Sequence, residues 1–255
     1  YLMLGGTNWF FVSQVCLQFS FFMAQWEEYY TGILPHACGK WIGVTEINYG
    51  MGLVSIMNAV IDREHLYADP LSKVLPDAMI SALPPSATDL QTRHLGVIIW
   101  ATLCIVMVAL CIGRVLTHVK QPQVMVSAIC KLFSPACLAA CPFLLPSDIM
   151  YDSARYLMLS IGLAYCLITV KLIFLSMAKM PYAVFQLDVL PMVLGTLWIR
   201  NDERLTLLGA KTICQVLTVW YLYRFLKWAS VACHQICDRL GIAVFTIPHK
   251  KTKTE

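Results

Sequence analysis

Residues 24–46, AQWEEYYTGILPHACGKWIGVTE, form a polar stretch between two long apolar segments. Its titratable side chains include Glu27, Glu28, His36, Lys40 and Glu46. In a chain that is 58% hydrophobic and only 13% charged, carboxylates and a histidine gathered at one boundary of an apolar segment are candidates for chemistry. The two flanking segments indicate what kind of fold surrounds them.

The composition predicts an integral membrane protein. The mean hydropathy is +0.66 over 255 residues, and too few polar residues are present to cover the exterior of a fold in water. The formal net charge of +4 is small and gathers in the tail at Lys250, Lys251 and Lys253. A short basic tail suits the cytosolic face of a membrane better than nucleic acid, so we expect no nucleic-acid partner.

Seven apolar segments are long enough to cross a hydrocarbon core of about 30 Å. They are residues 4–25, 44–61, 94–117, 124–145, 154–178, 182–199 and 205–233. Each must be a helix, because backbone amides in lipid have no water to bond. We therefore expect an all-α polytopic membrane protein with about seven transmembrane helices, one domain over residues 1–255, and a cytosolic tail at 234–255.

The loop charges predict an orientation. If the stretch 24–46 faces the cytosol, alternation of the segments places the basic C-terminal tail on the same side. The same side then receives Arg114, Lys120, Lys171 and Lys179. The chain begins at Tyr1 without an initiator methionine or a charged leader, so we expect it to start within a longer protein.

Several other residues are expected to have structural rather than chemical roles. Most of the eleven cysteines lie inside apolar segments and no CxxC pair occurs, so they are expected to act as packing residues. Lys131 lies near the start of its segment and is expected to extend its amine to the interface, the alternative being a buried functional role. Glu27 and Glu28 follow the interfacial Trp26 and are expected to leave the membrane.

The residues of the stretch 24–46 allow two interpretations each. Glu27 and Glu28 are metal ligands or bases, or else solvated loop charges. His36 is a base or an interface histidine. Glu46 begins an apolar helix, where a carboxylate is costly unless it caps the helix, is solvated or is used in chemistry. No GxSxG, GxxxxGK[ST] or HExxH motif points to a soluble-enzyme site.

A resemblance appears at these residues. WEEYYTG at 26–32, followed by VTE at 44–46, resembles the choline/ethanolamine phosphotransferases of the CDP-alcohol phosphatidyltransferase family. Residues 233–247 are similar to the last helix and short tail of that family. The resemblance implies that this chain corresponds to the later helices of a ten-helix fold.

The resemblance also implies a reaction. Those enzymes transfer phosphocholine or phosphoethanolamine from CDP-choline or CDP-ethanolamine to diacylglycerol, which yields phosphatidylcholine or phosphatidylethanolamine and CMP. The implied setting is the membrane of the endoplasmic reticulum or Golgi, with a homodimer as a further expectation. The resemblance assigns the catalytic base to Glu46 and substrate contacts to Trp26, Glu27 and Tyr29.

One part of the family pattern does not occur here. The signature DGxxARx8GxxxDxxxD, whose aspartates hold Mg²⁺ or Mn²⁺, has no match, and Asp152-Ser153-Ala154-Arg155 is similar to it only superficially. We therefore expect no metal ligands in this chain and a fragment that is inactive alone. The alternatives are a non-catalytic truncated protein that pairs with the full-length enzyme, and an unrelated transporter.

Overall fold

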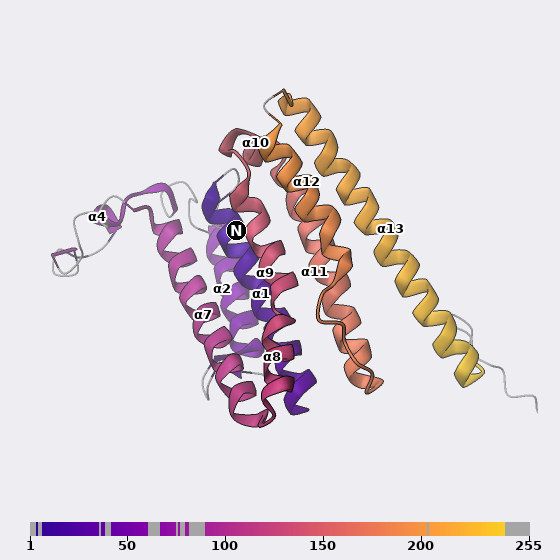
Figure 1. The fold of residues 1–255 in the computed structure, drawn as a ribbon. Helices are drawn as coiled ribbons and strands as arrows, with labels where there is room; N and C mark the ends of the chain where they lie inside the picture. Colours follow the sequence, from indigo (N-terminus) through magenta and orange to yellow (C-terminus); the bar gives the residue numbers. More distant parts are fainter. Residues whose placement is uncertain are drawn as a thin grey trace, which may run out of the picture.

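The computed structural model describes residues 4, 7–35, 37–38, 42–60, 67–74, 76, 80–81, 90–202 and 204–242. These residues form a helical assembly whose long members run side by side (Figure 1). The elements are α1 (Asn8–Thr31), β1 (Ala37–Cys38), β2 (Ile42–Gly43), α2 (Val44–Val60), α4 (Leu71–Val74), α7 (Thr92–His118), α8 (Pro122–Cys130), α9 (Phe133–Ala140), η1 (Cys141–Leu144), α10 (Ser147–Asp152), α11 (Ala154–Met177), η2 (Leu187–Val189), α12 (Leu190–Asn201) and α13 (Leu207–Leu240). The predicted all-α membrane protein is confirmed, with two paired strands of two residues each, β1 and β2, as a small addition.

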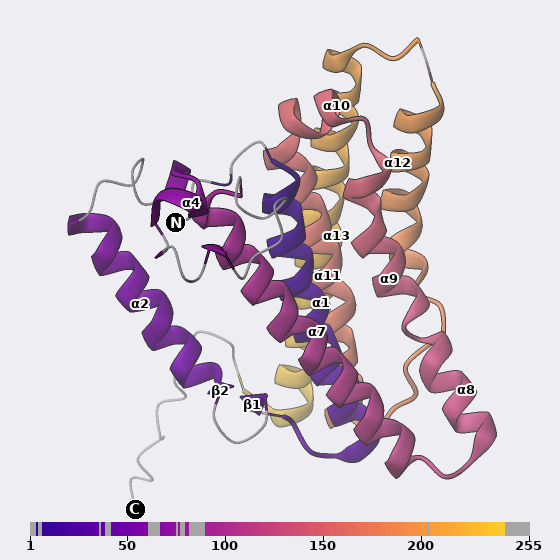
Figure 2. The ribbon, with the colours of Figure 1, turned by 90° about the vertical axis from the view of Figure 1, so that its left-hand side faces the viewer.

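Helix α1 is at the centre of the arrangement. It contacts α7 on one side and α11 on the other, and α11 in turn contacts α13 (Figures 1 and 2). Phe22 and Met23 of α1 are fully buried in the same cluster as Leu157 and Ile161 of α11. Because lipid tails are as apolar as these side chains, close packing rather than transfer from water holds such helices together.

Among the described residues, three helical stretches are long and apolar enough to cross a membrane, namely Thr92–His118, Pro122–Leu144 and Ala154–Met177. Two of them agree within two residues with the predicted segments 94–117 and 154–178. Helix α12 has 12 residues and is shorter than a full crossing, while α2 has 17 described residues, at the lower end of the range for one. The total of about seven crossings therefore stays a prediction.

The segment predicted at 124–145 is not one continuous helix. It divides into α8, α9 and η1, with a break at Lys131 and Leu132. Pro135 has no backbone N–H to bond four residues back, which removes the helical hydrogen bond at the break. The segment predicted at 182–199 likewise becomes helical at η2 and then α12, where Pro191 lies in the first turn.

Helices α1 and α13 continue well past the C-terminal ends of their predicted segments. Helix α1 continues past Trp26 to Thr31 and ends at Gly32, whose φ of 71° suits a residue without a side chain. Helix α13 begins at the cap Thr206 and continues to Leu240. The first residues of the tail expected at 234–255 are therefore helical as far as Leu240, and the cytosolic tail itself stays a prediction.

Candidate functional site

The last two turns of α1 lie against the ends of α7, α8 and α11, and Trp26 anchors them. Trp26 is 1% exposed, and its Nε1 donates to the carbonyl of Ala128 at 3.1 Å. That carbonyl is free because Leu132 N donates to Ile129 instead, at the break between α8 and α9. Trp26 is thus a packing residue that supplies a hydrogen bond to the free carbonyl at the helix break. Its contact with a substrate stays a prediction.

Glu27 is buried and paired, which contradicts the expectation that it leaves the membrane as a solvated charge. Its side chain is 4% exposed and lies against Arg114 of α7. Arg114 Nε donates to Oε1 at 2.5 Å, and Nη2 donates to Oε2 at 2.7 Å. Both carboxylate oxygens are therefore engaged within the protein, as in a bidentate arginine–carboxylate pair.

Tyr29 joins α1 to the turn after α11. Its Oη accepts a hydrogen bond from Tyr182 N at 3.0 Å and donates to the carbonyl of Met180 at 3.4 Å. The turn also contains Lys179 with a φ of 54°, an uncommon value for a residue other than glycine. The predicted role of Tyr29 in substrate binding remains a prediction, while the structure gives it a tertiary hydrogen-bonding role.

Lys131 lies beside Tyr29 and Tyr30 and does not extend into solvent. It is 7% exposed, its Nζ donates to Tyr30 Oη at 2.8 Å, and it lies 4.8 Å and 5.1 Å from the ring centroids of Tyr29 and Tyr30. The expectation that this amine reaches the interface is therefore wrong. Burial, with a smaller contribution from Tyr29, raises the pKa of the Tyr30 phenol, so this hydroxyl stays protonated at neutral pH.

A second, partly buried charge cluster was not predicted. Asp188 in η2 is paired with Lys171 of α11 and with Arg224 of α13, the latter at 2.5 Å. Tyr221 donates to the carbonyl of Asp188 at 2.8 Å and accepts from Met192 N at 3.1 Å. The sequence did contain a signal for this cluster. Lys171, Asp188 and Arg224 lie in three successive apolar segments, and ionisable residues of opposite charge in such segments usually pair.

Glu46 lies in the first turn of α2, which begins at Val44. The expectation that Glu46 stands at a helix N-terminus is confirmed, while its side chain and His36 lie outside the described residues. The β1–β2 pair leads directly into α2, and β1 contacts α7. The connection to Glu46 therefore passes beside the helix that carries Arg114.

The resemblance implies Mg²⁺ or Mn²⁺ in the complete enzyme. Among the residues that the structure describes, no group of three His, Cys, Asp or Glu side chains is placed to hold a metal ion. Those residues do not fit the Mg²⁺ or Mn²⁺ that the resemblance implies. We therefore derive no chemical step through a metal.

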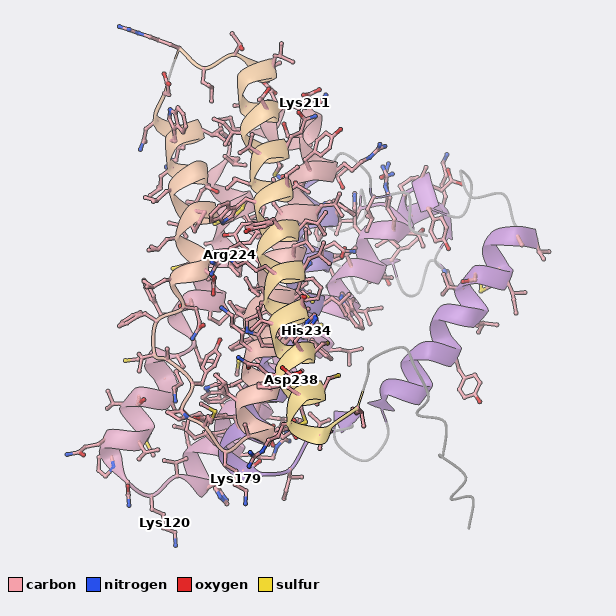
Figure 3. The ribbon with its side chains drawn as sticks, turned by 90° about the vertical axis from the view of Figure 1, so that its right-hand side faces the viewer. Lys120, Lys179, Lys211, Arg224, His234 and Asp238 are labelled. Atoms are coloured by element: carbon pink, nitrogen blue, oxygen red, sulfur yellow. The ribbon has the colours of Figure 1, made fainter. Side chains whose placement is uncertain are left out.

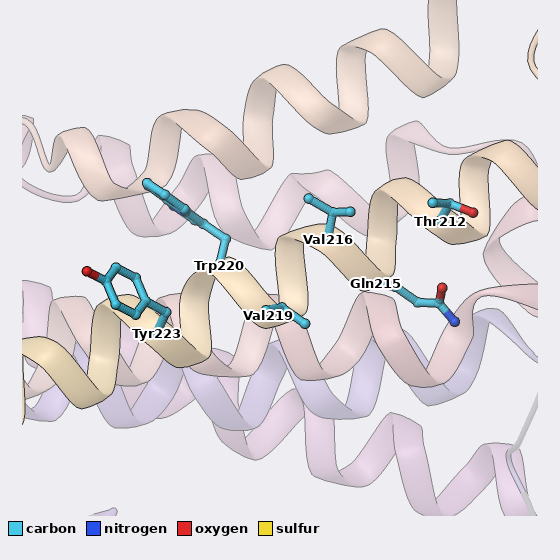
Figure 4. Close-up of a pocket in the computed structure, with 6 residues that line it drawn as sticks. All are labelled: Thr212, Gln215, Val216, Val219, Trp220 and Tyr223. Atoms are coloured by element: carbon cyan, nitrogen blue, oxygen red, sulfur yellow. The ribbon is translucent and has the colours of Figure 1, made fainter.

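The outer face of α13 has a hollow of about 430 Å³, which is mostly apolar (Figure 4). Its lining residues are Thr212, Gln215, Val216, Val219, Trp220 and Tyr223. A second apolar hollow of about 460 Å³ lies between α1, α7, α9 and η1. Exposed apolar faces of this kind suit contact with lipid.

These features define the class as an all-α integral membrane protein with a polar, partly charged cluster at one end of its helices. The chain is 26% identical over 251 residues to CDP-alcohol phosphatidyltransferase class-I family protein 3 of Dictyostelium discoideum, itself uncharacterized. It is 22% identical over 257 residues to the uncharacterized class-I family protein 2 of the same organism. These matches cover 90% and 96% of this chain but only 61% and 55% of the two relatives. No protein-family model matches the chain.

Proposed function

We propose that this chain takes part in phospholipid biosynthesis as a CDP-alcohol phosphotransferase. The proposed reaction moves phosphocholine or phosphoethanolamine from CDP-choline or CDP-ethanolamine to diacylglycerol and releases CMP. The observation that supports it is the similarity to two class-I proteins along 90% and 96% of the chain. Because the chain spans about 55–61% of their length, the activity is proposed for the whole protein.

Glu46 is the proposed general base of this reaction. Its carboxylate takes the proton from the diacylglycerol hydroxyl, whose oxygen forms a bond to the β-phosphorus of the CDP-alcohol. The bond from that phosphorus to the bridging oxygen breaks, and CMP leaves. An alcohol is a poor nucleophile until a base takes its proton, and a position in the first turn of α2 favours the ionised carboxylate.

The charge distribution supports the proposed orientation. Lys120 and Lys179 lie at one end of the helices, and Lys211 lies at the other (Figure 3). Arg155 and Arg200 belong to the same end as Lys211, while the end that holds Lys120 and Lys179 also receives Arg239 and the basic residues that follow α13 in the sequence. By the positive-inside rule, this end and the C-terminus would face the cytosol, where CDP-alcohols are soluble.

The test replaces Glu46 by Gln in the full-length product of the gene, expressed in microsomes that lack other CDP-alcohol transfer activity. We expect the unmodified protein to transfer labelled head group from at least one CDP-alcohol to diacylglycerol. E46Q should lower the rate about a hundredfold or more at equal protein level, the usual contribution of a general base.

The matched control is Glu28→Gln, which removes a carboxylate from the last turn of α1 and should leave the rate within about twofold. No transfer from either donor by the unmodified protein would overturn the proposed function. Near-normal turnover by E46Q would instead remove Glu46 from the mechanism and leave the reaction standing.

A further inference from the structure

The ammonium group of Lys131 is a buried positive charge whose compensation is incomplete. The residue is 7% exposed and lies at the break between α8 and α9. None of the salt bridges between described residues includes Lys131. Its Nζ contacts Tyr30 Oη and the rings of Tyr29 and Tyr30. Buried charges are costly unless an opposite charge or several hydrogen bonds compensate them.

The unused hydrogen-bond donors of Lys131 and Tyr30 indicate what kind of ligand would complete the cluster. An ammonium carries three donors, of which one is used on Tyr30 Oη. Tyr30 Oη accepts that bond, so its own proton is still available to donate. Within the described part of the chain, two N–H groups of Lys131 and the O–H group of Tyr30 therefore have no oxygen acceptor, and the other contacts of the ammonium are the faces of the two tyrosine rings.

The nearby carboxylate does not supply that acceptor. Glu27 lies on the same two turns of α1, but both of its oxygens accept from Arg114. Tyr29 and Tyr30 are themselves partly exposed, so the cluster reaches the surface at the end of the helices. A ligand with several acceptor oxygens and a negative charge fits this set of donors.

We propose that Lys131 and the hydroxyl of Tyr30 bind a phosphate group at this end of the helices. Phosphate offers a negative charge and three or more acceptor oxygens, and a lysine binds it as a point charge. The phosphate belongs either to a lipid head group or to a water-soluble phosphate compound. The proposal rests on this side-chain cluster alone and does not depend on the transfer reaction.

The test measures phosphate binding to the purified 255-residue chain in an uncharged detergent. One arm titrates sodium pyrophosphate, and the other titrates phosphatidic acid in mixed micelles, with diacylglycerol as the lipid that lacks a phosphate. We expect saturable binding in one of the two arms, and that arm identifies the source of the phosphate.

The variants separate binding from packing. Lys131→Met keeps the length of the side chain without its charge and should weaken binding about tenfold to a hundredfold, the range for a charge-assisted hydrogen bond. Tyr30→Phe keeps the ring and should weaken binding several-fold. Lys120→Met removes an exposed lysine at the same end and should leave the affinity unchanged.

Two results overturn the proposal. One is the absence of saturable binding in both arms, and the other is a K131M protein that binds as tightly as the unmodified chain. The unfolding temperature of each variant without ligand shows whether it is folded. If K131M does not fold, Y30F decides, and unchanged binding by Y30F then overturns the proposal.

Discussion

Arg114 of α7 holds Glu27 of α1 through two parallel hydrogen bonds, from Nε to Oε1 at 2.5 Å and from Nη2 to Oε2 at 2.7 Å. The two partners differ in exposure, since the arginine side chain is 41% exposed and the glutamate side chain only 4%. Removing one partner therefore has a different consequence from removing the other. The pair joins two helices at the end from which the chain leads to α2.

Arg114→Gln is expected to destabilise the fold more than Glu27→Gln. R114Q leaves a carboxylate buried and unpaired, at a cost of about 3 kcal/mol, whereas E27Q leaves an arginine that water can reach, at a cost of about 1 kcal/mol. The measurement is the free energy of unfolding in detergent micelles. The double variant should be more stable than R114Q alone, and equal losses in the two single variants would contradict the assigned burial.

Trp26→Phe tests the link between α1 and the broken helix α8–α9. The substitution removes the donor to Ala128 O, and that carbonyl is then buried without a partner, at a cost of about 1–3 kcal/mol. The unfolding free energy should fall by this amount plus a smaller term for the lost ring volume. Trp220→Phe on the exposed face of α13 is the control and should change stability by less than about 0.5 kcal/mol.

Asp188→Asn tests the second cluster. It leaves the cations Lys171 and Arg224 close to each other without the anion that both contact, so we expect a loss of about 3 kcal/mol in unfolding free energy. Asp148→Asn is the control, because Asp148 is exposed in the first turn of α10 and should contribute less than about 1 kcal/mol. A D188N protein as stable as the unmodified chain would show that the two cations do not depend on Asp188.

Apolar length predicted helices α7 and α11 closely, because both are uninterrupted runs of apolar residues between polar ends. The break between α8 and α9 at Lys131 was harder to predict, although Pro135 in the same segment was a signal for it. The partners of Glu27 and Lys131 lie 87 and 101 residues away in the sequence, and local pattern carries no information about such contacts. The sequence thus indicated which polar residues were unusual, while their pairing depended on the tertiary fold.

The orientation is tested with single cysteines placed at the two ends of the helices. Lys179→Cys places a thiol in the exposed turn after α11, and Lys211→Cys places one beside Asp152 at the opposite end. In microsomes, with the native thiols replaced by serine or alanine, a membrane-impermeant maleimide should label K179C before permeabilisation and K211C only afterwards. The labelled fraction, read as a mass shift on a gel, is the measurement. The reverse order of labelling would place the Lys131 cluster and the start of α2 on the lumenal side, out of reach of a cytosolic CDP-alcohol.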